Sequence, residues 1–558
     1  MVRKIINFFY RETSSLNQAA FLLGLLSLIS QIVGFLRDRL LAHIFGVGSE
    51  LDIYYAAFRI PDFLFVTVAS IVSLSVLIPF IIDKDAQGKE ELKKFINSIF
   101  TFFSLLMIVV AVATYFLMPQ FSSILFKGFD PEELSKVIFI SRLLLLSPII
   151  LGLSNLFGSL TQAYNRFLIY AFAPILYNAG IVLGILLLSH TYGIMGAVIG
   201  VIGGAVLHLL IQVPLVWQIG LLPKLSYHPD WQLVKRVVRI SLPRTLTLSM
   251  SSITFVFLIA MAARMSDGSV SIISLSNNLQ TISLSMIGVS YSLAAFPTLT
   301  RKFQEKNIPG FLEQMQITSR FIIFWSLPFT ALMVVLRAQI VRVLLGSGQF
   351  DWSATRLTAA SVALFVISTV FQSLILLFMR GFYSAGFTKK PFIINFISTI
   401  ILILITYGLV DYFYLSQSFR FFISSLLKVE DLSKSVVLML PLGFSIGTVI
   451  NGLWLWYSFE REFKGFSKHV LRTLFEGVSA SFIMGVGSYV GLIFFAPIFN
   501  LETLPGIFLQ GLCAGTLGIV LGVGVMVLLG SQEVQAVRST LKAKFWKTKV
   551  IATQPEIV

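Results

Sequence analysis

Near the start of the chain, two apolar stretches each contain a cluster of charged side chains. The charged residues are Arg37, Asp38 and Arg39 in the first stretch, and Asp52, Arg59 and Asp62 in the second. A guanidinium group binds phosphate through two parallel hydrogen bonds, so grouped Arg side chains suit an anionic headgroup. Neighbouring carboxylates would orient the guanidinium groups or exchange partners with them. These residues are therefore the first candidates for a binding site.

The position of these charges in apolar stretches indicates a cavity. An Arg or Asp side chain at the middle of a bilayer costs about 2.5–3.5 kcal/mol on insertion, so such residues usually face a bundle interior or water. Asp52, Arg59 and Asp62 are spaced i, i+7 and i+10 and fall on one face of a helix. Gly34 and Pro61 are expected to bend the two helices and to open space around the charges.

A purely structural role is the alternative. Arg37 or Arg39 with Asp38, and Arg59 with Asp62, would form ion pairs that only hold helices together. Arg39 would then extend its side chain toward the membrane surface. The residue types alone leave both roles open.

The composition predicts that the elements carrying these residues lie in lipid. Of 558 residues, 56% are hydrophobic and only 12% are charged, with a mean hydropathy of +0.88. A bilayer core about 30 Å thick needs roughly 20 apolar residues per helix. Such segments are predicted at 18–46, 51–82, 93–117, 133–159, 163–189, 193–218, 232–263, 269–300, 312–336, 354–382, 389–413, 435–459, 471–496 and 505–529. We therefore expect an all-α polytopic membrane protein of about fourteen transmembrane helices.

The basic residues predict the sidedness of this protein. The formal net charge is +16, but most Lys and Arg residues stand in short loops on the side of the N-terminus. Basic loops mark the cytoplasmic side, so we expect both termini in the cytoplasm of a bacterial inner membrane and no nucleic-acid partner. The tail from Arg538 to Lys549 would face anionic lipid or only help to set the topology. The first apolar run lacks a small-residue cleavage site and is predicted to be a retained helix.

Several kinds of chemistry are disfavoured. There is no G-x-x-x-x-G-K-[ST] loop for nucleotide phosphates. The five histidines are scattered and Cys513 is the single cysteine, so neither a metal site nor a disulfide framework is expected. A membrane enzyme of lipid-linked sugars would need an acidic or His cluster in the loops. We expect no enzyme and no cofactor.

A weak internal repeat in the sequence predicts that the protein has two lobes. FGSLTQAYNRFLIYAFAPILYN (157–178) and FYSAGFTKKPFIIN (382–395) share a basic turn followed by P-x-x-x-N. Pro79 and Pro297 similarly end two predicted helices before Lys-rich loops. Duplicated six-helix halves are typical of transporters that bind substrate where the halves meet. The predicted parts are an N-lobe (1–218), a C-lobe (219–459), two further helices (460–529) and a basic cytoplasmic tail (530–558).

The stretch SQIVGFLRDRLLAHIFGVGSELDIYYAAFRIPDFL (30–64) resembles the signature of the MurJ/MviN family of lipid II flippases. The matching residues are Ser30, Gly34, Arg37, Asp38, Phe45, Gly46, Gly48, Asp52, Ala57, Phe58 and Pro61. AAFPTL (294–299), QAYNRF with FAP (162–174) and RGFYSAGFTKKP (380–391) are similar to later landmarks of that family.

The resemblance implies two six-helix lobes around a central cavity, within the superfamily of multidrug and oligosaccharide-lipid exporters. It also implies alternating access that carries an undecaprenyl-linked peptidoglycan precursor outward. Arg37, Asp38 and Asp52 correspond to cavity residues, and Arg59 stands where the family often has Lys or Arg. Arg39, Asp62 and Asn278 are secondary candidates.

Three positions depart from the family pattern. Gln31, Phe65 and Asn278 stand where the family usually has Arg. Two alternatives to a lipid II flippase follow from this loss of positive charge. One is an exporter of another polyprenyl-linked oligosaccharide, and the other is a transport-inactive scaffold that recruits cell-wall synthesis proteins.

Overall fold

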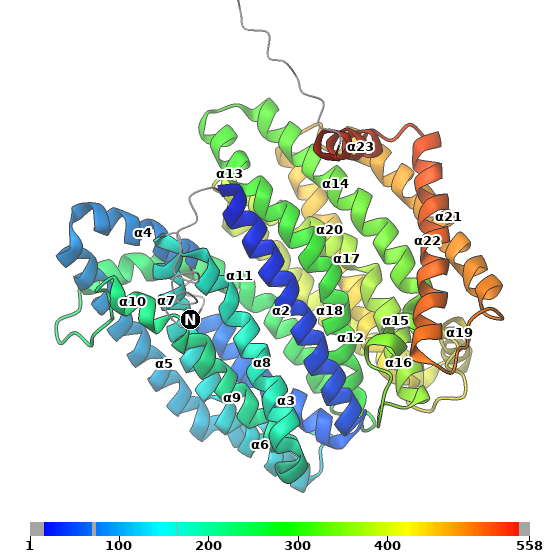
Figure 1. Cartoon of the computed structure of the whole chain (residues 1–558), viewed down its shortest axis with the longest axis horizontal. Helices are drawn as coiled ribbons and strands as arrows, with labels where there is room; N and C mark the ends of the chain where they lie inside the picture. The colour runs from blue at the N-terminus through cyan, green and yellow to red at the C-terminus, as the bar shows by residue number, and fades with distance from the viewer. Residues whose placement is uncertain (1–15, 70–73, 165, 546–558) are drawn as a thin grey trace, which may run out of the picture. The chain divides into compact units, whose positions relative to one another are not determined.

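A computed structural model describes residues 16–69, 74–164 and 166–545 of the chain, and within these ranges it contains helices and no strand. The helices are α2 (Leu16–Phe45), α3 (Ser49–Val68), α4 (Leu74–Gln87), α5 (Lys89–Leu125), α6 (Pro131–Leu144), α7 (Leu146–Ala163), α8 (Phe167–Tyr192), α9 (Ile194–Leu210), α10 (Val213–Gln218), α11 (Trp231–Ala262), α12 (Ser269–Ser283), a π-helix η2 (Leu284–Val289), α13 (Ser290–Gln304), α14 (Ile308–Val335), α15 (Arg337–Leu344), α16 (Trp352–Ile367), α17 (Thr369–Ser384), α18 (Lys389–Leu415), α19 (Gln417–Leu427), a 3-10 helix η3 (Ser435–Leu438), α20 (Met439–Glu462), α21 (Ser467–Phe495), α22 (Leu504–Leu528) and α23 (Gln532–Phe545). Figure 1 shows their course. The end of the predicted basic tail, 546–558, lies outside the described residues.

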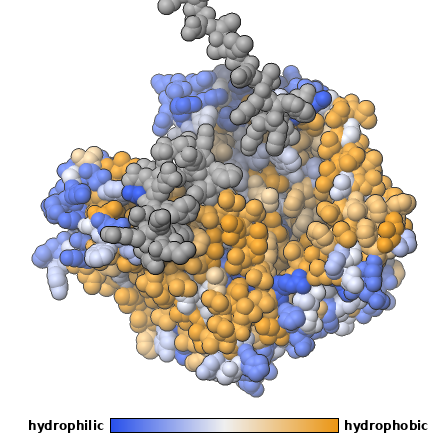
Figure 2. All heavy atoms as spheres, in the orientation of Figure 1, coloured by the Kyte–Doolittle hydropathy of each residue, from blue (hydrophilic) through white to orange (hydrophobic). Residues whose placement is uncertain are grey.

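The all-α membrane architecture is confirmed. In the described ranges, eleven helices or helix pairs are long and apolar enough to cross a membrane. The other three predicted segments correspond to α2, to α3 with α4, and to α11. Hydrophobic residues cover the sides of helices on the visible face, and hydrophilic residues gather toward helix ends (Figure 2). Large apolar side chains that would be costly in water are therefore placed against lipid.

Contacts divide the chain into two compact units. Unit 1 comprises 1–278, 344–361 and 388–447, and unit 2 comprises 279–343, 362–387 and 448–558. The two six-helix lobes expected from the internal repeat stay a prediction.

Within unit 1, α8 and α9 run side by side at very short range (Figure 1). A Cβ atom on Gly184 would stand 2.5 Å from the Cα of Gly200, so neither helix tolerates a larger residue there. Small residues that let two helix backbones approach are the usual means of packing helices in lipid. This pair supports α8, whose Asn178 belongs to the site described below.

Also within unit 1, the first half of α20 contains the sequence Gly443-Phe-Ser-Ile-Gly447, which has the spacing of a hydrolase nucleophile turn. The stretch is continuous helix and not a strand-to-helix turn. Cβ atoms on Gly443 and Gly447 would meet Thr406 at 2.4 Å and Leu402 at 2.5 Å on α18. The two glycines therefore serve helix packing, and Ser445 is buried between them.

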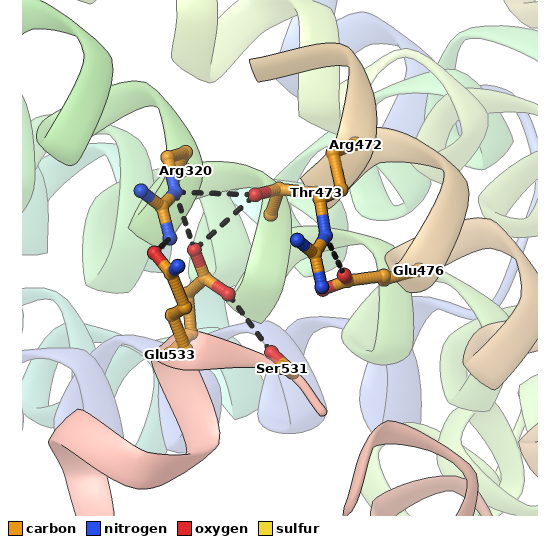
Figure 3. A network of polar contacts seen from close by, with 7 residues as sticks. Arg320, Arg472, Thr473, Glu476, Ser531 and Glu533 are labelled. Carbon is orange, nitrogen blue, oxygen red and sulfur yellow. Dashed lines mark hydrogen bonds and ion pairs between the residues drawn. The ribbon is translucent and has the colours of Figure 1, made fainter. Parts of the chain in front are cut away.

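Within unit 2, α21 and α22 pack against α14, and α23 lies across their ends (Figure 1). Figure 3 shows the polar network that holds α23 there. Glu533 accepts a hydrogen bond from Arg320 Nε on α14 at 2.6 Å and one from Thr473 on α21 at 3.2 Å. Ser531 donates to its other oxygen at 2.8 Å. Val534 and Val537 add apolar contact beside these groups.

Replacing Glu533 with Gln is expected to loosen α23. The Glu533 side chain is 2% exposed, and loss of its charge leaves Arg320 without its ion-pair partner. A hydrogen bond to a charged group contributes about 1.5–3 kcal/mol, so amide hydrogen exchange over 532–539 should accelerate at least about tenfold. The exposed Gln535→Ala on the same helix is the control and should leave exchange unchanged. Equal exchange in Glu533→Gln and the wild type would contradict this role.

The same contact predicts a pH dependence. Burial opposes ionisation of Glu533, but its hydrogen bonds, including those from Ser531 and Arg320, outweigh burial and hold its pKa below the ordinary value of 4.5. A lowered carboxyl pKa contributes stability that is complete above pH 4.5 and is lost as the pH falls through the folded-state value. Relative to the intrinsic exchange rate at each pH, the protection of α23 amides should therefore fall below pH 4.5 in the wild type, and Glu533→Gln should remove that change.

Candidate functional site

The centre of the candidate site is an ion pair between adjacent residues of α2. The Nε and Nη2 atoms of Arg37 lie 2.9 and 2.8 Å from the same carboxylate oxygen of Asp38. The Asp38 side chain is 5% exposed, whereas that of Arg37 is 23% exposed. A guanidinium has five N–H donors, so Arg37 retains donor capacity beyond this pair.

Two asparagines on other helices form hydrogen bonds with this ion pair. The third nitrogen of Arg37, Nη1, donates to the Asn178 Oδ1 atom on α8 at 2.9 Å. Asn178 in turn donates to the carbonyl of Pro174 at 3.2 Å and to Ser30 at 3.4 Å. The second oxygen of Asp38 accepts from Asn278 Nδ2 on α12 at 3.0 Å. Arg37, Asp38 and Asn278 are thus brought together as predicted candidates, and three helices fix the orientation of one guanidinium.

Asn178→Leu is expected to release Arg37 from α8. The change removes the acceptor of a charged donor, which is worth about 1.5–3 kcal/mol, and should lower the thermal unfolding temperature of the purified protein. Asn178→Asp retains an acceptor oxygen and is the matched control that should preserve the contact. Equal unfolding temperatures for Asn178→Leu and the wild type would show that this bond does not hold Arg37.

Arg59 lies on α3, where a backbone carbonyl and an aromatic ring contact its guanidinium group. Its Nε donates to the carbonyl of Tyr55 at 2.9 Å, and its guanidinium carbon lies 4.8 Å from the ring centre of Phe255 on α11. A cation over an aromatic face gains about 0.5–2 kcal/mol. No ion pair joins Arg59 and Asp62 in the described part of the chain, and Asp62 is exposed. Arg39 is half-buried on α2.

Pro61 leaves one backbone carbonyl of α3 without a donor in its own helix, and a residue of another helix satisfies it. Because Pro61 lacks an N–H, the carbonyl of Ala57 four residues earlier has no donor within α3. Ser141 on α6 donates its hydroxyl to that carbonyl at 3.0 Å. The helix carrying Arg59 is therefore continuous and its free carbonyl is satisfied from a neighbouring helix.

Asp52 is placed at a helix end. Its carboxylate accepts hydrogen bonds from the backbone N–H groups of Gly268 and Ser271, each at 2.7 Å, and from the Ser271 hydroxyl. These groups form the N-terminus of α12, where the aligned peptide dipoles favour a negative charge. We call this contact of Asp52 with Gly268 and Ser271 the Asp52 cap. The carboxylate is 3% exposed, and its hydrogen bonds among the described residues go to α12 and not to Arg37.

Close backbone contacts surround the Asp52 cap. The turn between α2 and α3 contains Gly46, whose φ of +64° favours glycine and whose added Cβ would lie 2.8 Å from the carbonyl oxygen of Gln349. Gln349 also donates its N–H to the carbonyl of His43 at 2.9 Å. The turn around Gly46 thus allows the α2–α3 connection to pack directly on the 345–351 turn.

Sequence reasoning missed four residues around the ion pair. Asn178 was noted only as part of the P-x-x-x-N repeat, which was the available signal. Tyr54, Tyr55 and Tyr177 lie in the surroundings of Arg37. The Tyr55 hydroxyl is buried without a hydrogen-bond partner in the described residues, so it is a spare donor beside the site. In the sequence of an apolar helix, an aromatic residue that lies beside a binding site cannot be distinguished from one that only packs against other helices.

Known proteins of one family match this chain over most of its length. The family model described as lipid II flippase MurJ matches residues 41–509. A probable lipid II flippase MurJ of Thermotoga maritima is 27% identical over 376 residues, covering 67% of this chain and 75% of the relative. The lipid II flippase MurJ of Burkholderia cenocepacia is 24% identical over 380 residues, covering 65% and 72%.

Solved structures agree on the fold. A lipid II flippase MurJ in an inward closed conformation matches with a TM-score of 0.70 and 21% identity, covering 93% of this chain and 99% of that one. An inward-facing multidrug transporter of the MATE family matches with a TM-score of 0.61 and 16% identity, covering 77% and 95%. Because the family model spans well over half of its length, the chain belongs to the lipid II flippase MurJ family.

Proposed function

We propose that this protein moves lipid II, the lipid-linked peptidoglycan precursor, from the inner to the outer leaflet of the bacterial cytoplasmic membrane by alternating access. The observation that carries the proposal is the Arg37 guanidinium held by Asp38 and Asn178 among the helices of a chain of the MurJ family. An oriented, partly exposed guanidinium suits a diphosphate, because charge-assisted, bidentate hydrogen bonds to phosphate are strong.

In this mechanism the headgroup binds at Arg37 while the polyprenyl tail stays in lipid. Asp38 and the two asparagines hold the guanidinium in place before substrate arrives, which lowers the ordering cost of binding. Arg59, held over Phe255, supplies a second cation. In the same proposal Asp52 is a gate residue: its hydrogen bonds to Gly268 and Ser271 close one end, and breaking them opens it.

The moving parts are proposed to be the N-lobe (1–218) and the C-lobe (219–459), with both termini in the cytoplasm. Movement of each charge across the membrane potential is worth about 2.3 kcal/mol per 100 mV. A potential is therefore one source of energy for the cycle, and a coupled ion is the other. Cell-wall synthesis proteins are proposed as partners that use the flipped precursor.

The test is outward flipping of lipid II in proteoliposomes that contain the wild-type protein, with and without an imposed membrane potential. Flipping above that of protein-free liposomes is expected, with no added nucleotide. A well-folded wild type that flips no lipid II under either condition would exclude the proposal.

A second candidate is an exporter of a different polyprenyl-linked oligosaccharide. Phe65 stands at a position where a cation was expected and packs against the apolar core of unit 1, so no cation acts there. Asn278 at another such position donates to Asp38 instead of offering a positive charge. Flipping assays with lipid II and with a polyprenyl-linked neutral oligosaccharide distinguish the candidates by which substrate moves faster.

A further inference from the structure

The short helix α19 has a large apolar face that no part of unit 1 covers. Phe421, Phe422 and Leu426 are 65%, 59% and 62% exposed. Ile423 and Leu427 on the opposite face are 6% and 7% exposed and pack inward. Bare aromatic side chains of this size are unfavourable in water and mark a contact with lipid or protein.

The position of α19 in the chain identifies lipid as the partner. Ser416 alone separates α19 from the end of α18, and its hydroxyl caps the new helix. A helix of 27 residues such as α18 is about 40 Å long, which matches a bilayer including its headgroup layers. Two Cα steps cover less than about 8 Å, so α19 begins close to the end of the membrane span.

The exposed surface of α18 continues directly onto α19. Leu404 and Tyr407 on the membrane span are exposed, as are Tyr412 and Tyr414 near its end. Tyr412 contacts Phe419 of α19, with ring centres 4.9 Å apart and ring planes tilted by 48°. Aromatic side chains gather at the boundary between lipid and water, where their rings are buried and their polar atoms stay hydrated. The apolar face of α19 therefore extends a surface that already faces lipid.

Hydrogen bonds at the C-terminal end of α19 hold the helix against the rest of unit 1. Lys428, in the left-handed conformation, ends α19, and its carbonyl accepts two hydrogen bonds from Arg356 on α16. Arg356 also pairs with Asp431 at 2.6 and 2.7 Å. Lys434 then donates to the carbonyl of Asp267 at 2.7 Å, next to Gly268 of the Asp52 cap. These bonds hold α19 on unit 1 at the same end as the Asp52 cap.

We propose that α19 is an interfacial helix whose Phe421, Phe422 and Leu426 side chains insert into the lipid at the membrane boundary. It anchors the segment that ends beside the Asp52 cap to the surrounding leaflet. The helix has no acidic residue, and its single charge, Arg420, is exposed and able to reach lipid phosphates.

The test uses single nitroxide labels on the full chain in nanodiscs of phosphatidylethanolamine and phosphatidylglycerol. Cys513 is the only native cysteine, so Cys513→Ser provides a background for Phe422→Cys and Leu426→Cys. Collision of each label with oxygen, which concentrates in lipid, is compared with collision with a water-soluble nickel chelate. Leu404→Cys calibrates lipid, Glu430→Cys calibrates water and Leu427→Cys calibrates the protein interior.

The oxygen-to-nickel ratio at 422 and 426 is expected to match that at 404 and to exceed that at 430. A ratio equal to that at 430 would place α19 in water and overturn the proposal. Low collision with both reagents, as at 427, would also overturn it, because it would mean that protein covers this face. A normal thermal unfolding temperature for each labelled variant shows that the label has not displaced the helix.

Discussion

Asp52→Asn is expected to reduce lipid II flipping about 100-fold. The Asp52 carboxylate accepts from two backbone N–H groups and one hydroxyl at the positive end of α12. An Asn side chain has no charge and presents an NH₂ group that cannot accept. A hydrogen bond to a charged group is worth about 1.5–3 kcal/mol, and the helix end adds up to about 2 kcal/mol. A loss of about 3 kcal/mol corresponds to about 100-fold in the population with the cap closed.

The closed population is measured by thiol labelling. Ser269→Cys in the Cys513→Ser background places a thiol at a fully buried position beside the Asp52 cap. Asp52→Asn should increase its reaction with a membrane-impermeant reagent by up to about 100-fold, in parallel with lost flipping. Glu50→Gln removes the same charge from an exposed residue in the same turn of α3 and should change neither quantity. Unchanged labelling in Asp52→Asn would mean that the cap does not control access.

Arg37→Ala is expected to reduce flipping to a similar extent, but for a different reason. The variant loses the cation proposed to bind the diphosphate, and among the described residues it leaves the Asp38 carboxylate with Asn278 as its partner. Removing one member of a buried, hydrogen-bonded charge pair costs about 2–5 kcal/mol. Arg37→Lys keeps the positive charge but cannot form bidentate hydrogen bonds, so its flipping rate should be intermediate. Flipping by reconstituted protein is the measurement, and the exposed Arg538→Ala is the control.

A double variant separates substrate binding from helix pairing. Arg37→Ala with Asp38→Asn removes both charges, so no unpaired carboxylate remains to destabilise α2. If the double variant has a normal thermal unfolding temperature and still fails to flip, Arg37 acts on the substrate. If it flips at the wild-type rate, the ion pair only holds helices together and the proposed binding role is wrong.

Much of the architecture was determined by the sequence alone. Within the described residues, each of the fourteen predicted apolar segments coincides with one or more helices, because hydrogen-bonding needs in lipid leave a long apolar segment no other spanning structure. The pattern around Arg37 and Asp38 also identified the family and the helix that carries the central ion pair. Gly46 was visible only as a residue that matches the family, and its positive φ came from the structure.

The partners of each charge were decided only by the tertiary structure. Spacing placed Asp52, Arg59 and Asp62 on one helical face, yet Asp52 caps α12, Arg59 lies over Phe255, and Asp62 is exposed. Asn178 reaches Arg37 across 141 positions of sequence. A helix period reports which side chains share a face, but not which neighbouring helix meets that face. The packing of distant helices fixes that choice, and it gives charges of the same type different roles.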